Sequence, residues 1–169
     1  MKRNLKWIGL LLSVVLVLAF TACGSEQGDS GEDTSAEFDI AAGLTRTDDA
    51  ATGEATVETD CFSVTLPAGE TWECVVDGPN SIMFYNIAAR EEFGGRLFSV
   101  EAFEPEDESY DPMPFCVLGE RDGKKIVVTY PSDVQYDFQD EAASAEYLEV
   151  FWVAQQFSDD PATSPIVLK

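Results

Sequence analysis

The sequence predicts an α+β fold in which an antiparallel β-sheet carries one long C-terminal helix, all within a single domain at residues 59–169. Three observations predict this fold. Apolar and polar residues alternate in short runs after Cys61, an Asp-Gly dipeptide separates two of those runs, and apolar residues recur at helical spacing after Asp140. A domain of this length can enclose one hydrophobic core, which excludes a receptor with two lobes that close around a ligand.

The first 22 residues predict a signal peptide. Lys2, Arg3 and Lys6 form a basic start, residues 8–20 form a mostly apolar run, and small residues follow it. The apolar run is shorter than the ~20 residues that cross a bilayer as a helix, although an uncleaved anchor remains the alternative. Either interpretation places the rest of the chain outside the cytoplasm.

The end of this peptide, Phe20-Thr21-Ala22-Cys23, resembles the lipobox of bacterial lipoproteins, in which a small residue and then Gly or Ala precede the cysteine. Phe20 stands at the position usually held by Leu. The resemblance implies cleavage between Ala22 and Cys23 and attachment of diacylglycerol to Cys23. The chain is therefore expected to be an extracytoplasmic protein that its N-terminal lipid anchors to the bacterial membrane.

Residues 23–58 predict an acidic, disordered tether between the lipid and the domain. Gly, Ser, Thr, Ala, Asp and Glu dominate this segment, and Arg46 is its one basic residue. Such a segment cannot bury enough apolar surface to offset its ordering entropy, and its like charges repel one another. A brief helix near residues 38–44 is a further possibility.

Four strands are expected in the first half of the domain. Apolar and polar residues alternate from Phe62 to Leu66, a turn follows at residues 67–69, and residues 72–76 form the second strand. Residues 81–87 are apolar on both faces, which predicts a central strand covered on both sides. The fourth strand is expected at residues 97–103.

The clearest hairpin in the chain joins two apolar runs through Asp122-Gly123, a dipeptide typical of a type I′ turn. A two-residue turn at that point places Phe115 opposite Tyr130 and Val117 opposite Val128. Aromatic and branched side chains then share one face of the hairpin.

Two helices are expected, a short one at residues 88–93 and a long one that begins after Asp140 as its N-cap. The apolar residues of the long helix form one stripe, which predicts that it lies flat on the sheet. They are Tyr147, Leu148, Val150, Phe151, Trp152, Ala154 and Phe157. Residues 165–168 are either a last edge strand or a loose tail.

The charge balance excludes one class of partner. The chain has 32 acidic and 10 basic residues, with a formal net charge of −22. Nucleic acid is therefore not an expected partner, because its binding requires Lys and Arg to neutralise phosphates. The charge also repels anionic lipids, so the acyl chain would have to hold the protein at the membrane.

Three cysteines lie in the domain, at positions 61, 74 and 116. An odd number allows at most one internal disulfide, and Cys61 with Cys74 is the favoured pair because they flank a short turn and could face each other across a hairpin. The alternative is three buried thiols that pack as small apolar residues. No Cys-x-x-Cys spacing and no histidine occur, which argues against a zinc site of the common kinds.

The sequence offers little for catalysis. A serine or cysteine nucleophile normally needs histidine as its base, and the chain has none. No glycine-rich phosphate-binding pattern occurs, so no cofactor is expected. Two carboxylates acting together, as in glycoside hydrolysis, remain the one route to an enzyme.

Two weaker binding hypotheses concern loops. An acidic loop could coordinate calcium through several oxygens, although its spacing is not that of an EF-hand. Its candidate ligands are Glu104, Glu106, Asp107, Glu108 and Asp111. Tyr110 and Tyr136 lie outside the strand patterns and could contact a carbohydrate or peptide.

Three segments carry a further resemblance, at residues 62–67, 95–100 and 130–135. They are similar to segments of a group of bacterial lipoproteins and secreted domains and, more distantly, of the PsbP/Mog1-like fold, an antiparallel sheet with helices on its faces. The resemblance covers residues 61–157 and implies an α+β sandwich often used for binding or assembly, without an implied catalytic activity.

These features predict a non-catalytic binding or interaction module of the cell envelope. Its expected partners are the membrane, through the lipid on Cys23, and an envelope protein or ligand. The alternative is a hydrolase that uses two carboxylates on an envelope or extracellular substrate.

Overall fold

The computed structural model describes residues 38–156 and 163–169, which belong to one compact unit. The predictions for the signal peptide, for cleavage at Ala22 and for lipid attachment at Cys23 lie outside the described residues. The described part is an α+β fold with antiparallel strands, as predicted, but its strands form two sheets instead of one.

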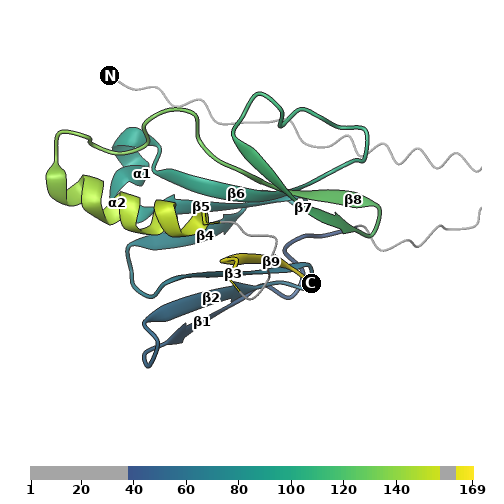
Figure 1. Cartoon of the computed structure of the whole chain (residues 1–169), viewed down its shortest axis with the longest axis horizontal. Helices are drawn as coiled ribbons and strands as arrows, with labels where there is room; N and C mark the ends of the chain where they lie inside the picture. The colour runs from purple at the N-terminus through teal and green to yellow at the C-terminus, as the bar shows by residue number, and fades with distance from the viewer. Residues whose placement is uncertain (1–37, 157–162) are drawn as a thin grey trace, which may run out of the picture. The chain divides into compact units, whose positions relative to one another are not determined.

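Sheet A has four strands in the order β1-β2-β3-β9, and sheet B has five in the order β4-β5-β6-β8-β7 (Figure 1). The strands of sheet A are β1 (Thr45–Asp49), β2 (Glu54–Glu58), β3 (Phe62–Pro67) and β9 (Ile166–Leu168). Those of sheet B are β4 (Trp72–Val76), β5 (Ser81–Asn86), β6 (Arg96–Phe103), β7 (Phe115–Arg121) and β8 (Lys124–Thr129). The helices are α1 (Ile87–Phe93) and α2 (Glu141–Ala154).

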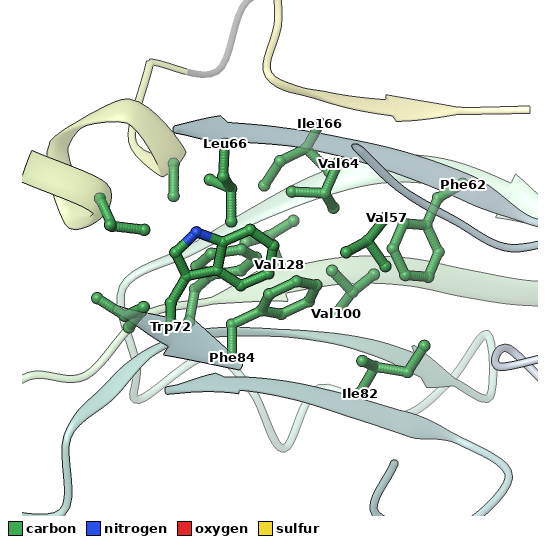
Figure 2. Close-up of a cluster of buried hydrophobic side chains, with 14 of the residues drawn as sticks. Val57, Phe62, Val64, Leu66, Trp72, Ile82, Phe84, Val100, Val128 and Ile166 are labelled. Atoms are coloured by element: carbon green, nitrogen blue, oxygen red, sulfur yellow. The ribbon is translucent and has the colours of Figure 1, made fainter. Parts of the chain in front are cut away.

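The core lies between the inner faces of the two sheets. Figure 2 shows Val57, Val64 and Leu66 of sheet A pointing toward Phe84 and Trp72 of sheet B. The rings of Phe84 and Phe98 stack at a centroid distance of 4.3 Å and extend this contact along sheet B. Each buried aromatic or branched side chain stabilises the fold by roughly 1.5–3 kcal/mol through removal of apolar surface from water.

The predicted tether at residues 23–58 is wrong in its second half, because β1 and β2 form a hairpin there. Ala55 and Val57 are buried in the core, and the neighbouring Ile40 is fully buried with its N–H donating to Pro79 O at 2.9 Å. Two apolar positions were too few to predict a strand from composition. A turn, not a helix, occupies residues 40–43.

The strands β3 and β4 do not form the hairpin that would bring Cys61 near Cys74. β3 pairs with β2 and β9, whereas β4 pairs with β5 in the other sheet. The indole N–H of Trp72 donates to Pro67 O at 2.8 Å and fixes the crossing between the sheets. Cys61 and Cys74 are free thiols, so the predicted disulfide is absent.

β5 lies between β4 and β6, but its two faces differ. Ile82 and Phe84 are buried on the inner face, while Met83 and Tyr85 are only half-buried on the outer one. The Arg90 guanidinium carbon lies 4.4 Å from the ring centroid of Tyr85 and covers part of that face. The prediction of full cover on both faces is therefore wrong for the outer face.

The helix α1 confirms the predicted short helix. Asn86 caps it by accepting a hydrogen bond from Ala89 N at 2.9 Å. The chain leaves the helix through two glycines, and Gly95 has φ +61°. A Cβ at Gly95 would lie 2.6 Å from Arg90 N, so only glycine fits this tight exit.

The β7–β8 hairpin has the predicted turn but not the predicted register. Asp122 and Gly123 both have positive φ, 49° and 78°, as a type I′ turn requires. A β-bulge at Leu118 then shifts the pairing by one residue, so that Phe115 lies opposite Thr129 and Val117 opposite Val127. A bulge inserts one unpaired residue in one strand, which the turn alone cannot predict.

The helix α2 begins as predicted, with the Asp140 carboxylate accepting from Ala142 N and Ala143 N. It packs against β6 and β3 and buries Tyr147, Val150 and Ala154. Trp152 is 56% exposed and does not belong to the buried stripe, and Phe157 lies outside the described residues. The strand β9 pairs with β3, which decides for an edge strand at the C-terminal segment.

Candidate functional site

Tyr110 does not offer an exposed contact, because it is only 4% exposed. Its ring lies between those of Phe103 and Phe115, at centroid distances of 4.9 and 4.8 Å. The loop between β6 and β7 turns back over the outer face of sheet B and places the ring there. The prediction of a ligand contact at Tyr110 is wrong.

Tyr136 is half-buried and packs on the helix α2. Its ring stacks on Tyr147 at a centroid distance of 4.6 Å. The hydroxyl of Tyr147 in turn donates to Arg96 O at 2.5 Å, which ties the helix to β6. Tyr136 therefore supports the packing of α2 instead of standing apart as a contact residue.

The acidic loop does not assemble a cation site. Glu104 forms an ion pair with Lys124, and Asp107 accepts from Ser109 N at 2.8 Å, a hydrogen bond that lowers the pKa of Asp107. Glu106, Glu108 and Asp111 are exposed. Within residues 38–156 and 163–169, no three carboxylates or thiols are placed to hold a metal ion.

The cysteines that the structure buries are poor nucleophiles. Cys61 is 4% exposed, and burial raises the pKa of its thiol. Burial also raises the pKa of Cys74. Because the thiolate is the reactive form, a raised pKa keeps these thiols inert near neutral pH.

The densest polar constellation lies on the outer face of sheet B, where Arg96, Ser99 and Glu101 of β6 meet Thr129 of β8. We call these four residues the polar cluster. Arg96 Nη2 donates to Ser99 Oγ and Thr129 Oγ1, both at 2.6 Å. The two hydroxyls donate to Glu101 Oε1, Ser99 at 2.5 Å and Thr129 at 2.9 Å.

A serine hydrogen-bonded to a carboxylate could in principle act as a nucleophile. Ser99 and Thr129 are both 0% exposed, however, and Arg96 and Glu101 keep only 24% and 20% of their side-chain surface. A substrate atom has no path to either hydroxyl. The polar cluster therefore joins β6 to β8 and covers the sheet, and its chemistry is structural.

A groove on the outer face of sheet A is the more promising site. It has a volume of about 620 Å³, within the ~300–1,000 Å³ range of ligand sites. Its floor comes from β2, β3 and β9, and its wall comes from the end of α2 and the segment before β9. The lining residues are Glu54, Ser63, Thr65, Val153, Gln156, Thr163, Ser164, Pro165 and Val167.

Strand pairing explains why polar groups face this groove. Val64 and Leu66 of β3 point into the core, so Ser63 and Thr65 point outward. Thr65 lies opposite Thr56 of β2, with the two hydroxyl oxygens 3.4 Å apart. The alternation of β3 is visible in the sequence, but the wall formed by Val153, Gln156 and residues 163–165 is not.

Three of these groups have no partner within the described residues. In the part of the chain that the structure describes, the side chains of Glu54, Ser63 and Gln156 make no hydrogen bond or ion pair. Of the lining residues that the structure describes, Glu54 is the one that is charged. The groove thus presents a carboxylate, an amide and hydroxyls to solvent.

Two smaller cavities are less suited to a ligand. One of about 360 Å³ is lined by three exposed aspartates, Asp39, Asp60 and Asp122, together with Arg121. The other, of about 280 Å³, lies beside Tyr130 at the start of β7. Both are smaller than the groove on sheet A.

Comparisons of the chain with protein-family models, with curated proteins and with solved structures found no match. No helix within the described residues is long and apolar enough to cross a membrane.

Proposed function

We propose that this chain is an extracytoplasmic lipoprotein whose sandwich domain is a non-catalytic binding module, and that the groove on sheet A holds its ligand. In this proposal residues 1–22 are a signal peptide and Cys23 carries the lipid. The basic start, the apolar run and the small residues before Cys23 support the anchoring.

The observation that carries the binding function is the set of unpartnered polar groups in the groove. Glu54 of β2 and Gln156, which follows α2, both line it. Polar groups fixed on a packed scaffold can bind a ligand without prior rearrangement.

The alternative, a hydrolase with two carboxylates, has weaker support. Such an enzyme needs two carboxyl groups in unlike environments, one protonated and one ionised. Among the described residues, the groove has a single carboxylate, Glu54. Asp39, Asp60 and Asp122 share the smaller cavity, but all three are exposed, so their surroundings do not differ in this way.

The PsbP/Mog1-like arrangement is also part of the proposal. The antiparallel sheet B with α2 packed against β6 supports it. The four-stranded sheet A is an addition to the single sheet with helices on its faces that this arrangement describes.

The binding function is tested by sedimentation of the full chain, purified in detergent, with delipidated envelope fragments. Thr65→Trp would fill the groove, and Thr47→Trp is the matched control, because Thr47 occupies the same face of sheet A on β1 outside the groove. We expect the native chain and Thr47→Trp to sediment with the fragments and Thr65→Trp to remain in solution. Equal sedimentation of all three would exclude the groove as the binding site.

The anchoring is tested separately with Cys23→Ala. This variant should lose incorporation of a fatty-acid label and leave the membrane fraction. Retention of both label and membrane association would contradict lipid attachment at Cys23.

A further inference from the structure

We infer that the groove on sheet A binds a neutral glycan chain. The inference rests on the proposed function, since it assumes that the groove is the ligand site, and it adds the chemical class of the ligand.

Charge excludes polyanions from the groove. Among the described residues that line it, Glu54 is the one that is charged, and the chain as a whole has a net charge of −22. A polymer that carries phosphates or many carboxylates would meet repulsion without a cation to pair with. The ligand must therefore carry no net negative charge.

The strand arrangement disfavours an extended peptide. Peptides commonly bind a sheet by adding a strand to an unpaired edge. The central strand of the groove floor is β3, which already pairs with β2 on one side and β9 on the other. Its backbone groups are used in those ladders, so only side chains remain to contact a ligand.

The side chains of the groove match the two surfaces of a sugar ring. Glu54, Ser63 and Gln156 can accept or donate hydrogen bonds to hydroxyl groups along the ring edge. Val153, Pro165 and Val167 line the same groove and offer apolar contact to the C–H face of the ring. A neutral sugar has both surfaces within one residue, and consecutive residues repeat them along the chain.

Position and rigidity add to this match. Ser63 and Val167 sit at neighbouring register positions of β3 and β9, and Glu54 follows on β2 opposite Pro67. Polar and apolar groups are thus held in fixed order across three hydrogen-bonded strands. The strand backbone that carries these groups would need no ordering on binding, which favours recognition by a shallow site.

The experiment titrates the full chain, purified in detergent, with a linear N-acetylglucosamine tetramer as the probe and follows binding by calorimetry. We expect saturable binding by the native chain and by Thr47→Trp, and none by Thr65→Trp. Glu54→Gln should weaken binding about tenfold or more, because a hydrogen bond to a charged group contributes roughly 1.5–3 kcal/mol. Thermal unfolding of each variant checks that it is folded.

Three results would overturn the inference. The first is no binding of the tetramer by the native chain, the second is equal binding by Thr65→Trp, and the third is tighter binding of a sulfated polyanionic glycan than of the tetramer. Digestion of the envelope fragments with a protease or a glycosidase distinguishes a protein ligand from a glycan. If protease treatment and not glycosidase treatment abolishes sedimentation, the ligand is a protein.

The two proposals fail in distinguishable ways. Groove-dependent sedimentation without tetramer binding would leave the binding module in place and remove the glycan. If Thr65→Trp changes neither the sedimentation nor the binding of the tetramer, both the groove as the binding site and the glycan as its ligand are excluded.

Discussion

The outer faces of the two sheets carry polar residues in contrasting states. On sheet B, Ser99 and Thr129 are fully buried and share Glu101 as their acceptor. On sheet A, Ser63 and Glu54 face a groove and have no partner within the described residues. The residue types are similar, but one set is satisfied within the protein and the other is open to solvent.

This contrast separates stability from recognition. Removing one partner of a buried polar network leaves the others unsatisfied, at a cost of about 1–3 kcal/mol for each neutral group. Removing a polar group that only water contacts costs the fold little. The polar cluster should therefore control the free energy of unfolding, and the groove should control binding.

The largest effect is expected for Glu101→Ala. It removes the acceptor shared by two buried hydroxyls and takes the ion-pair partner from Arg96. The free energy of unfolding should fall by about 2–4 kcal/mol in chemical denaturation. Glu54→Ala is the matched control in the groove, and an equal loss in both variants would remove the distinction between the faces.

Thr129→Val comes next, because it keeps the shape of the side chain and removes only the hydroxyl. Arg96 loses an acceptor and Glu101 loses a donor. We expect a loss of about 1–3 kcal/mol, measured in the same way. Thr65→Val makes the same change in the groove and should be nearly neutral; a comparable loss there would show that its hydroxyl is structural.

Arg46→Ala tests whether interaction partners or burial determine how much a polar side chain contributes to the free energy of unfolding. Arg46 is 30% exposed, yet it donates to Gly69 O at 2.6 Å and lies over the Trp72 ring, 4.1 Å from its centroid. It links β1 to the edge of sheet B, and its loss should cost roughly 1–2 kcal/mol. Arg46→Lys should recover only part of this, since lysine lacks the planar fork. An unchanged free energy of unfolding in Arg46→Ala would show that burial alone determines the contribution of a polar side chain to stability.

Alkaline pH probes two further buried polar groups. Burial raises the pKa of both Tyr130 and Tyr147, whose hydroxyls donate to backbone carbonyls. The unfolded chain releases these protons from about pH 10, while the folded chain retains them to higher pH. Stability is therefore complete below about pH 10 and falls above it, by up to about 1.4 kcal/mol per pH unit for each group.

Tyr147→Phe should reduce the steepness of this alkaline loss in denaturation curves recorded between pH 9 and 11. Cys61, which is buried, and Cys74, which is half-buried, have raised pKa values and act in the same direction, but they are present in both proteins. An unchanged slope in Tyr147→Phe would assign the alkaline transition to other groups.

The smallest effect is expected for Ser63→Ala in the groove. Its hydroxyl has no partner within the described residues, so the free energy of unfolding should change by less than about 0.5 kcal/mol. Thermal unfolding checks this, and a loss above about 1 kcal/mol would mean that the hydroxyl is satisfied internally.

The sequence predicted correctly those elements that depend on interactions between a few neighbouring residues. Asp140 begins α2 because its carboxylate caps free N–H groups, and Asp122-Gly123 makes a turn because both residues adopt positive φ. These features depend on a few consecutive residues, which a sequence displays directly.

Features set by distant contacts could not be predicted in this way. The bulge at Leu118 changes the register of a correctly predicted hairpin, and Gly119 there lies against Leu168 of β9, where a Cβ would be 2.7 Å from Leu168 Cδ2. Tyr110 is polar enough to suggest exposure, yet its loop folds back over sheet B. In each case a residue far along the chain decides the outcome.

The candidate site shows the same limit. The outward positions of Ser63 and Thr65 follow from alternation along β3, but the groove exists only because Val153, Gln156 and Pro165 rise beside them. The hairpin of β1 and β2 was missed because its outward residues are polar and only Ala55 and Val57 enter the core.

The early start of the folded unit limits where this protein can work. Ile40 is fixed in the core, so only residues 24–37 separate the proposed lipid on Cys23 from Phe38, the first described residue. A fully extended segment of that length spans at most about 50 Å. A tether that ran to residue 58 would span up to about 120 Å. The domain would remain within that distance of the bilayer, and it could bind only a glycan that comes equally close to the membrane.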